Sequence, residues 1–282
     1  MGCSYRFNSF QFWLWLKNLL LTQQQIMGYP VKKEGRFTYC EEGEGEVIVL
    51  LHGLFGALSN FDSIIRHFSP NYKVVIPQLP LFELEVDQTT VTGMVDYIDE
   101  FIEFKGWQRV HLIGNSLGGH VGQMYYLRKR HKVISMVLTG SSGLFENSLG
   151  DTYPRKGDYE YVRKKTEGTF YNREVATKEL VDSVFEVVNN RNTAIRMVVM
   201  AKSALRHNLR DEVAGMDLPV CLIWGKNDNI TPAFVGEEFH KLLPHSELHI
   251  IDRCGHAPMM EQSEEFNAIL ERFLNKVKQG AF

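Results

Sequence analysis

The residues around Ser116 have the types and spacing of a serine nucleophile. Residues 112–120 read Leu-Ile-Gly-Asn-Ser-Leu-Gly-Gly-His, so an apolar stretch precedes the serine and a glycine stands two positions away on each side. A serine hydroxyl becomes a useful nucleophile only when a base takes its proton and donors hold the resulting oxyanion. Because Gly114 and Gly118 lack a Cβ atom, the chain can turn sharply from strand to helix and present Ser116. A tight turn in which Ser116 only caps the helix is the alternative.

Asp228 is the expected acid partner. It follows the apolar residues 219–225, at the carboxyl end of an expected strand, where parallel sheets place their functional groups. An Asx-turn, or a cap for the helix that Pro232 begins, is the alternative for this residue. Asp252 also ends an expected strand and is a second candidate for the acid.

His256 is the expected base among ten histidines. It lies in a short Gly-His-Ala-Pro loop directly after the expected strand at 246–251, and a side chain on a loop can reach the serine. The order Ser116, Asp228, His256 is that of an α/β-hydrolase triad and differs from the orders of the other large serine-triad folds. The sequence therefore predicts a Ser-His-Asp triad.

The chain resembles the α/β-hydrolase superfamily over residues 30–278. An apolar stretch at 46–52 runs into a His-Gly-Leu-Phe-Gly turn that begins at His52 and is similar to the oxyanion turn of that family. By this resemblance the oxyanion donors are the backbone N–H groups of Leu54 and Leu117, the second at the positive end of a helix. His52 is expected to support the turn by hydrogen bonds.

Strands and helices alternate from residue 36, which predicts an α/β protein with a mostly parallel central sheet flanked by helices. Strands are expected at 36–40, 46–52, 72–77, 109–114, 133–139, 219–224 and 246–251. The alternation stops within 144–212, where helices are expected at 159–165, 174–189 and 193–205. This insertion resembles the helical cap that many α/β-hydrolases place over the active site. The expected domains are a core of 28–143 and 213–282, a cap of 144–212, and an extension of 1–27 that need not belong to the fold.

The cap is expected to roof the substrate pocket. Candidates for substrate contact are Met197 in the cap, Phe55 in the oxyanion turn and Asn115 beside the nucleophile. A place in the core of the cap is the alternative for Met197. Arg191, Arg196 and Lys202 are candidates for a substrate carboxylate, with solvated cap surface as the alternative for each.

The composition indicates which binding partners and which cellular compartment to expect. The 31 basic and 34 acidic residues give a net charge of −3, which offers no reason to expect nucleic acid. Four cysteines without Cys-x-x-Cys spacing fit a reducing, cytoplasmic compartment. No metal-binding motif is visible, and we expect neither a metal nor a cofactor. The oligomeric state does not follow from the sequence.

The N-terminal region departs from the rest of the chain. Residues 10–21 are strongly apolar but too short to span a bilayer, and they lack the features of a signal peptide. Membrane contact is not expected, unless residues 10–21 form an interfacial helix. The other alternative is that Met27 is the working start and residues 1–26 are not native.

The dehalogenases and epoxide hydrolases of this superfamily carry an aspartate nucleophile, so Ser116 argues against those two activities. The reaction that remains is acyl transfer to water. We expect a serine hydrolase that cleaves a small apolar carboxylic ester or related acyl compound through an acyl-enzyme. The Gly-Asn-Ser-Leu-Gly-Gly stretch is also similar to hydrolases that cleave C–C bonds of ring-cleavage diketone acids. Those enzymes typically carry Trp after the histidine, where this chain has Ala257. A non-catalytic ligand receptor on the same fold is an alternative of another class.

Overall fold

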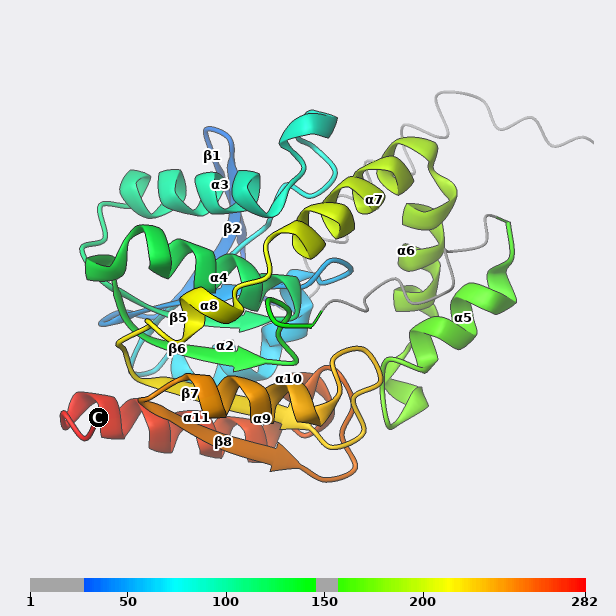
Figure 1. Ribbon diagram of the computed structural model, residues 1–282. Helices are drawn as coiled ribbons and strands as arrows, with labels where there is room; N and C mark the ends of the chain where they lie inside the picture. The colour runs from blue at the N-terminus through cyan, green and yellow to red at the C-terminus, as the bar shows by residue number, and fades with distance from the viewer. Residues whose placement is uncertain (1–27, 146–156) are drawn as a thin grey trace, which may run out of the picture.

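The computed structural model describes residues 28–145 and 157–282, and a single sheet forms its centre (Figure 1). The strand order is β1-β2-β4-β3-β5-β6-β7-β8. The strands are β1 Val31–Glu34, β2 Phe37–Glu42, β3 Val47–Leu51, β4 Lys73–Pro77, β5 Val110–Asn115, β6 Val133–Thr139, β7 Val220–Gly225 and β8 Ser246–Ile251. β2 pairs antiparallel with β1 and β4, and the other neighbours are parallel. The mostly parallel sheet is therefore confirmed.

The sequence analysis missed β1. This strand reads Val-Lys-Lys-Glu and none of its residues is buried. It lies at the edge of the sheet, where it pairs only with β2. An edge strand that buries no face needs no alternation of apolar and polar residues, so it leaves little pattern in the sequence.

Helices cover both faces of the sheet (Figure 1). The helices of the described residues are α2 Asp62–Phe68, α3 Val91–Phe104, α4 Leu117–Arg128, α5 Tyr159–Glu167, α6 Lys178–Asn189, α7 Arg191–Arg206, α8 Arg210–Val213, α9 Ala233–Leu242, α10 Pro258–Glu261 and α11 Ser263–Lys278. Val49 of β3 packs into the cluster that includes α3, α4 and α9, and its neighbours Ile48 and Leu50 pack into the cluster of α2 and α11. Successive strand residues point to opposite faces, so a strand covered on both sides is apolar throughout.

Helix α3 shows why the pattern of apolar residues predicted the core. Phe101 and Ile102 lie three and four residues after Ile98, which lies four residues after Met94, and all four are buried against the sheet. Each buried side chain of this size stabilises the fold by about 1.5–3 kcal/mol relative to an exposed one. The Thr90 side chain begins the helix by accepting a hydrogen bond from the Gly93 N–H.

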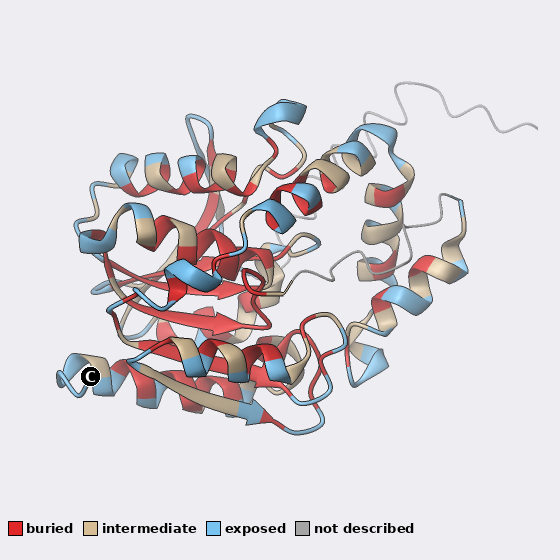
Figure 2. Ribbon diagram, in the orientation of Figure 1, coloured by how far each residue is buried: buried red, intermediate tan, exposed pale blue. Residues whose placement is uncertain are grey.

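The chain between β6 and β7 forms helices α5 to α8. In Figure 1 the carboxyl ends of the parallel strands point toward α5, α6 and α7. Figure 2 shows buried central strands, whereas α5 and α6 alternate between exposed and buried residues. The helix expected at 174–189 starts later, because Arg173–Val175 form a 3-10 turn and α6 begins after its cap, Thr177. Asn190 then separates α6 from α7 by accepting hydrogen bonds from the N–H groups at 192 and 193.

Among the described helices, none has the length and apolar character to cross a bilayer. The expectations for residues 10–21 and for Met27 fall outside the described residues, as does the part of the expected cap at 146–156.

Candidate active site

Ser116 occupies the turn between β5 and α4 and has the unusual backbone angles φ 55° and ψ −120°. A non-glycine residue in such a conformation costs about 1–3 kcal/mol and is found mainly at functional sites. The residue with the positive φ is Ser116, so Gly114 and Gly118 are not needed for that conformation. They are needed because neighbouring backbone lies too close for a Cβ atom. A Cβ atom on Gly118 would lie 2.0 Å from the Leu51 carbonyl oxygen, and one on Gly114 would lie 2.5 Å from the backbone of α4. The motif therefore lets α4 start directly against the sheet.

Asp228 and His256 meet beyond the ends of β7 and β8. The His256 Nδ1–H donates to Asp228 Oδ2 at 2.9 Å, and both side chains are nearly inaccessible to solvent. Thr231 Oγ1 donates to the same carboxylate oxygen at 2.9 Å. The N–H groups of Ile230 and Thr231 donate to Asp228 Oδ1 at 2.8 and 2.9 Å, so the Asx-turn is present as well. With Nδ1 protonated, the neutral ring leaves Nε2 as an acceptor.

The second candidate for the acid lies apart from the histidine. The Asp252 side chain is 67% exposed and its carboxylate lies 3.0 Å from Lys226 Nζ. The hydrogen bond and charge of Lys226 lower the pKa of Asp252. Of the two carboxylates, Asp228 is the one that the structure brings to His256.

Two residues at the carboxyl ends of central strands, Asn115 and Gly140, lie against the histidine. Asn115 is buried, and its Nδ2 donates to the Thr139 carbonyl at 3.0 Å and to the His256 carbonyl at 3.1 Å. The amide expected to contact substrate thus links the nucleophile strand to the histidine loop. Gly140 has φ +49°, and a Cβ atom there would lie 2.9 Å from His256 Nδ1 and 3.1 Å from Asp228 Oδ2. Sequence reasoning missed Gly140, although a glycine directly after a buried strand was the available signal.

His52 supports the expected oxyanion turn. Its Nδ1–H donates to the Gly53 carbonyl at 2.9 Å, and its Nε2 accepts from the Leu79 N–H at 3.0 Å. Burial lowers the pKa of His52, so the ring stays neutral. The turn itself lies against the nucleophile, since a Cβ atom on Gly53 would lie 3.2 Å from Ser116 Cβ.

A small pocket of about 30 Å³ opens beside the nucleophile. Ser116, Ser142 and Thr231 supply its polar lining, and Leu54, Leu117, Phe145, Met200, Ala201, Ala204 and Ile230 supply the apolar lining. The turn of Leu54 and the helix start of Leu117 therefore meet at Ser116. Among the described residues that line the pocket, none is charged. Ser142 was missed because a serine after a strand is common in any loop.

The other substrate candidates lie outside this lining. Met197 is buried in α7, one helical turn from the lining residue Met200, and Phe55 is 40% exposed. Arg196 Nε donates to the Leu84 carbonyl at 2.8 Å, which fastens α7 to the core. Arg191 is exposed at the start of α7. The structure thus brings Ser116, Leu54 and Leu117 together at the pocket and leaves both arginines outside it.

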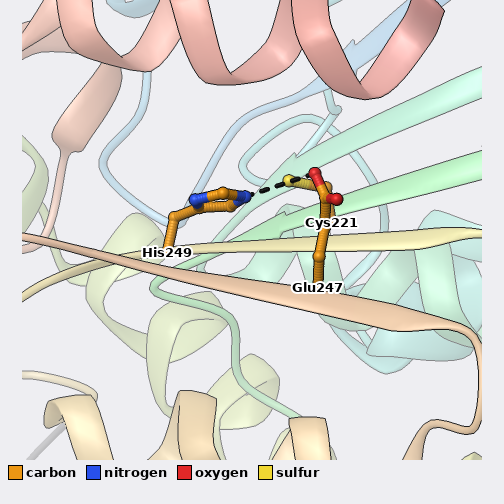
Figure 3. A group of neighbouring side chains, drawn as sticks. All are labelled: Cys221, Glu247 and His249. Atoms are coloured by element: carbon orange, nitrogen blue, oxygen red, sulfur yellow. Dashed lines mark hydrogen bonds and ion pairs between the residues drawn. The ribbon is translucent and has the colours of Figure 1, made fainter. Parts of the chain in front are cut away.

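A second cluster of polar side chains, Cys221, Glu247 and His249, lies on β7 and β8 (Figure 3). These groups are close enough to hold a metal ion, but Lys276 Nζ already lies 2.5 Å from Glu247 Oε2. His249 Nε2 lies 3.2 Å from the other oxygen of Glu247. Burial raises the pKa of the Cys221 thiol, which opposes the thiolate that a metal would need. The cluster is best described as a hydrogen-bonded ion pair.

Comparison with known proteins identifies the family. The model of the α/β-hydrolase fold family matches residues 46–263, and the chain belongs to this family. An α/β-hydrolase enzyme from the metagenome of sediments of the Mar Chica lagoon, Morocco, is 43% identical, with a TM-score of 0.73, covering 89% of this chain and 99% of that one. The chain is 26% identical to the 2-hydroxy-6-oxononadienedioate/2-hydroxy-6-oxononatrienedioate hydrolase 2 of Pseudomonas putida, over 84% of this chain and 90% of the relative. A bacterial membrane phospholipase A shares the fold at 23% identity and a TM-score of 0.81, covering 94% of this chain and 92% of that one.

Proposed function

We propose that this hydrolase cleaves small apolar carboxylic esters through a Ser116-His256-Asp228 triad. His256 Nε2 takes the Ser116 hydroxyl proton while Oγ attacks the ester carbonyl. The N–H groups of Leu54 and Leu117 hold the negative oxygen of the tetrahedral intermediate. The intermediate then collapses, and the alcohol leaves with the proton held by His256. Water, activated by His256, attacks the acyl-enzyme and releases the acid and free Ser116.

The observation that carries this proposal is that the described residues lining the pocket at Ser116 are mostly apolar and that none of them is charged. An apolar acyl group gains free energy on entering such a pocket, whereas a carboxylate would lose its hydration without a cation to replace it. The buried free thiols of Cys40, Cys221 and Cys254 also support a reducing, cytoplasmic location.

The second candidate is hydrolysis of a C–C bond in a vinylogous diketone acid. Curated relatives favour it, because the Pseudomonas putida enzyme and a Comamonas testosteroni enzyme, 23% identical, are named as hydrolases of such compounds. That substrate needs a partner for its carboxylate. Arg196 donates to the carbonyls of Leu84 and Asn192, and it lies outside the lining of the pocket at Ser116.

The two candidates are separated by comparing kcat/KM for a short p-nitrophenyl ester and for an anionic dienoic diketone acid. We expect the ester to be cleaved faster, and Ser116→Ala to abolish its cleavage. Faster cleavage of the diketone acid would establish the C–C hydrolase instead. If folded protein turned over neither and an alkyl fluorophosphonate failed to label Ser116, the receptor alternative would replace both.

A further inference from the structure

The turn after α5 lies directly on the loop that carries His256. The His256 N–H donates to the carbonyl of Thr169 at 3.0 Å. A Cβ atom on Gly255 would lie 2.6 Å from that same carbonyl oxygen and 2.9 Å from the Cα of Phe170. The Phe170 side chain is buried in the same apolar cluster as Ala257 of the loop. The cap therefore touches the backbone of the histidine itself.

One half-buried carboxylate joins these two segments. Glu261, at the end of α10, accepts from the Gly255 N–H through Oε1 at 2.9 Å. Its Oε2 accepts from the N–H groups of Tyr171 at 2.7 Å and Asn172 at 3.3 Å. Each oxygen thus serves a different segment, one the histidine loop and the other the cap. Burial raises the pKa of Glu261, while the backbone donors oppose this rise.

The position of the His256 backbone helps to place Nε2, because Asp228 holds the ring at Nδ1 alone. Asp228 fixes His256 Nδ1, but the position of Nε2 also depends on the backbone from which the ring projects. That backbone is held on one side by Asn115, which donates to the His256 carbonyl, and on the other by the Thr169 carbonyl. A displacement of about 1 Å in a catalytic group can reduce the rate by about 10²-fold.

We propose that Glu261 is a positioning residue that couples the cap to His256, by holding the turn at 169–172 and the loop at 255–256 on its two oxygens. The inference that Glu261 affects catalysis rests on the proposed function, whereas the coupling of the two segments does not. A glutamine is a discriminating replacement, because its amide has one acceptor oxygen and its NH₂ group cannot accept from a backbone N–H. Either the cap or the histidine loop then loses its acceptor.

The coupling is tested by hydrogen exchange of the full chain, comparing Glu261→Gln and Glu261→Ala with the parent. Glu264→Gln is the matched control, because Glu264 is exposed at the start of α11 and lies three residues away. We expect peptides covering 168–173 and 253–258 to lose protection together in Glu261→Ala, while β5 and the control variant keep it. Loss of protection in one of the two segments alone, or in neither, in Glu261→Ala would overturn the coupling.

The catalytic consequence is read from the same variants with the short ester, well below their melting temperatures. We expect kcat to fall by roughly 10- to 100-fold and KM to change by less than about threefold, because the base is misplaced while the apolar pocket is kept. The rate at which a fluorophosphonate labels Ser116 should fall with kcat. An unchanged kcat and labelling rate in a folded Glu261→Ala variant would show that Glu261 is structural only. If the parent does not cleave the ester, the proposed function fails, and hydrogen exchange still decides the coupling.

Discussion

At the scale of single residues, the site combines a strained serine with a fully partnered acid. Ser116 adopts a positive φ where glycine is the usual residue. Asp228 receives hydrogen bonds on both oxygens, from the backbone and from Thr231 and His256. Such partners hold the carboxylate in one orientation toward the histidine, which is what the orienting acid of a triad requires.

Ser116→Ala should lower kcat/KM for the short ester by about 10⁴-fold or more, because the members of a triad act as a unit. The fold should persist, since the change removes one hydroxyl at the pocket surface and leaves no cavity in the core. Steady-state kinetics and thermal unfolding measure the two effects. Activity within about tenfold of the parent would refute the assigned nucleophile, given the usual size of such losses.

Asp228→Asn should reduce kcat by roughly 10³- to 10⁴-fold, because the amide favours the wrong imidazole tautomer. Asp252→Asn is the matched control and should leave kcat unchanged, since Asp252 is exposed and paired with Lys226. Both variants are assayed with the same ester at neutral pH. If Asp252→Asn were the damaging change, the roles of the two carboxylates would have to be exchanged.

At the scale of elements, α7 contacts both the core and the pocket. Ser203 Oγ accepts from the N–H of Val91 at the start of α3, and Arg196 donates to the Leu84 carbonyl. Met200, Ala201 and Ala204 of the same helix line the pocket. A helix fastened to the core at two points forms a fixed roof, so the length of the acyl group should be selected by shape.

Ala204→Val should narrow the pocket and increase the preference for short acyl groups. Compared with the parent, kcat/KM for a butyryl or hexanoyl ester should fall about tenfold or more, because an apolar group that no longer fits costs about 1–3 kcal/mol. The acetyl ester should change much less. Ala194→Val, on the same helix but away from the lining, controls for the lower helix propensity of valine. Equal losses for all chain lengths would contradict a pocket roofed by α7.

At the scale of the whole molecule, buried histidines link stability to pH. His111 lies within β5 and His120 within α4, and neither exposes more than 3% of its surface. Burial lowers the pKa of both side chains to about 4, with a smaller contribution from Arg109 at His111. An unfolded histidine takes its proton near pH 6.5.

The free energy of unfolding should therefore fall as the pH drops from 6.5 toward 4, because the unfolded chain binds protons that the folded chain does not. Each such histidine contributes a slope of about 1.4 kcal/mol per pH unit within this window. His111→Asn should make the decline less steep in urea unfolding at pH 7 and pH 5. The exposed His131→Asn serves as the control. An identical decline in the parent and His111→Asn would contradict the neutral buried state of His111.

The elements of the core were largely predictable from sequence, because burial on both faces of a parallel sheet leaves continuous apolar strands. The apolar residues of α3, Val91–Phe104, likewise recur at the spacing of a helix that buries one face. β1 was missed since it buries no face, and the start of α6 was misplaced because Thr177 caps the helix three residues after the apparent periodicity begins. The periodicity of apolar residues indicates which positions are buried, but it indicates the first residue of a helix only weakly.

The sequence by itself determined the family, the parallel sheet and the order of Ser116, Asp228 and His256, because these depend on residue types and on periods of two or 3.6 residues. The tertiary structure alone decided which aspartate reaches the histidine, since Asp228 and Asp252 follow neighbouring strands, but Asp228 is hydrogen-bonded to His256 whereas Asp252 is exposed beside Lys226. It likewise decided that Asn115 serves the backbone and that Glu261 joins the cap to the histidine loop. These contacts join segments far apart in the chain, whose meeting is set by the packing of the whole fold and leaves no local pattern.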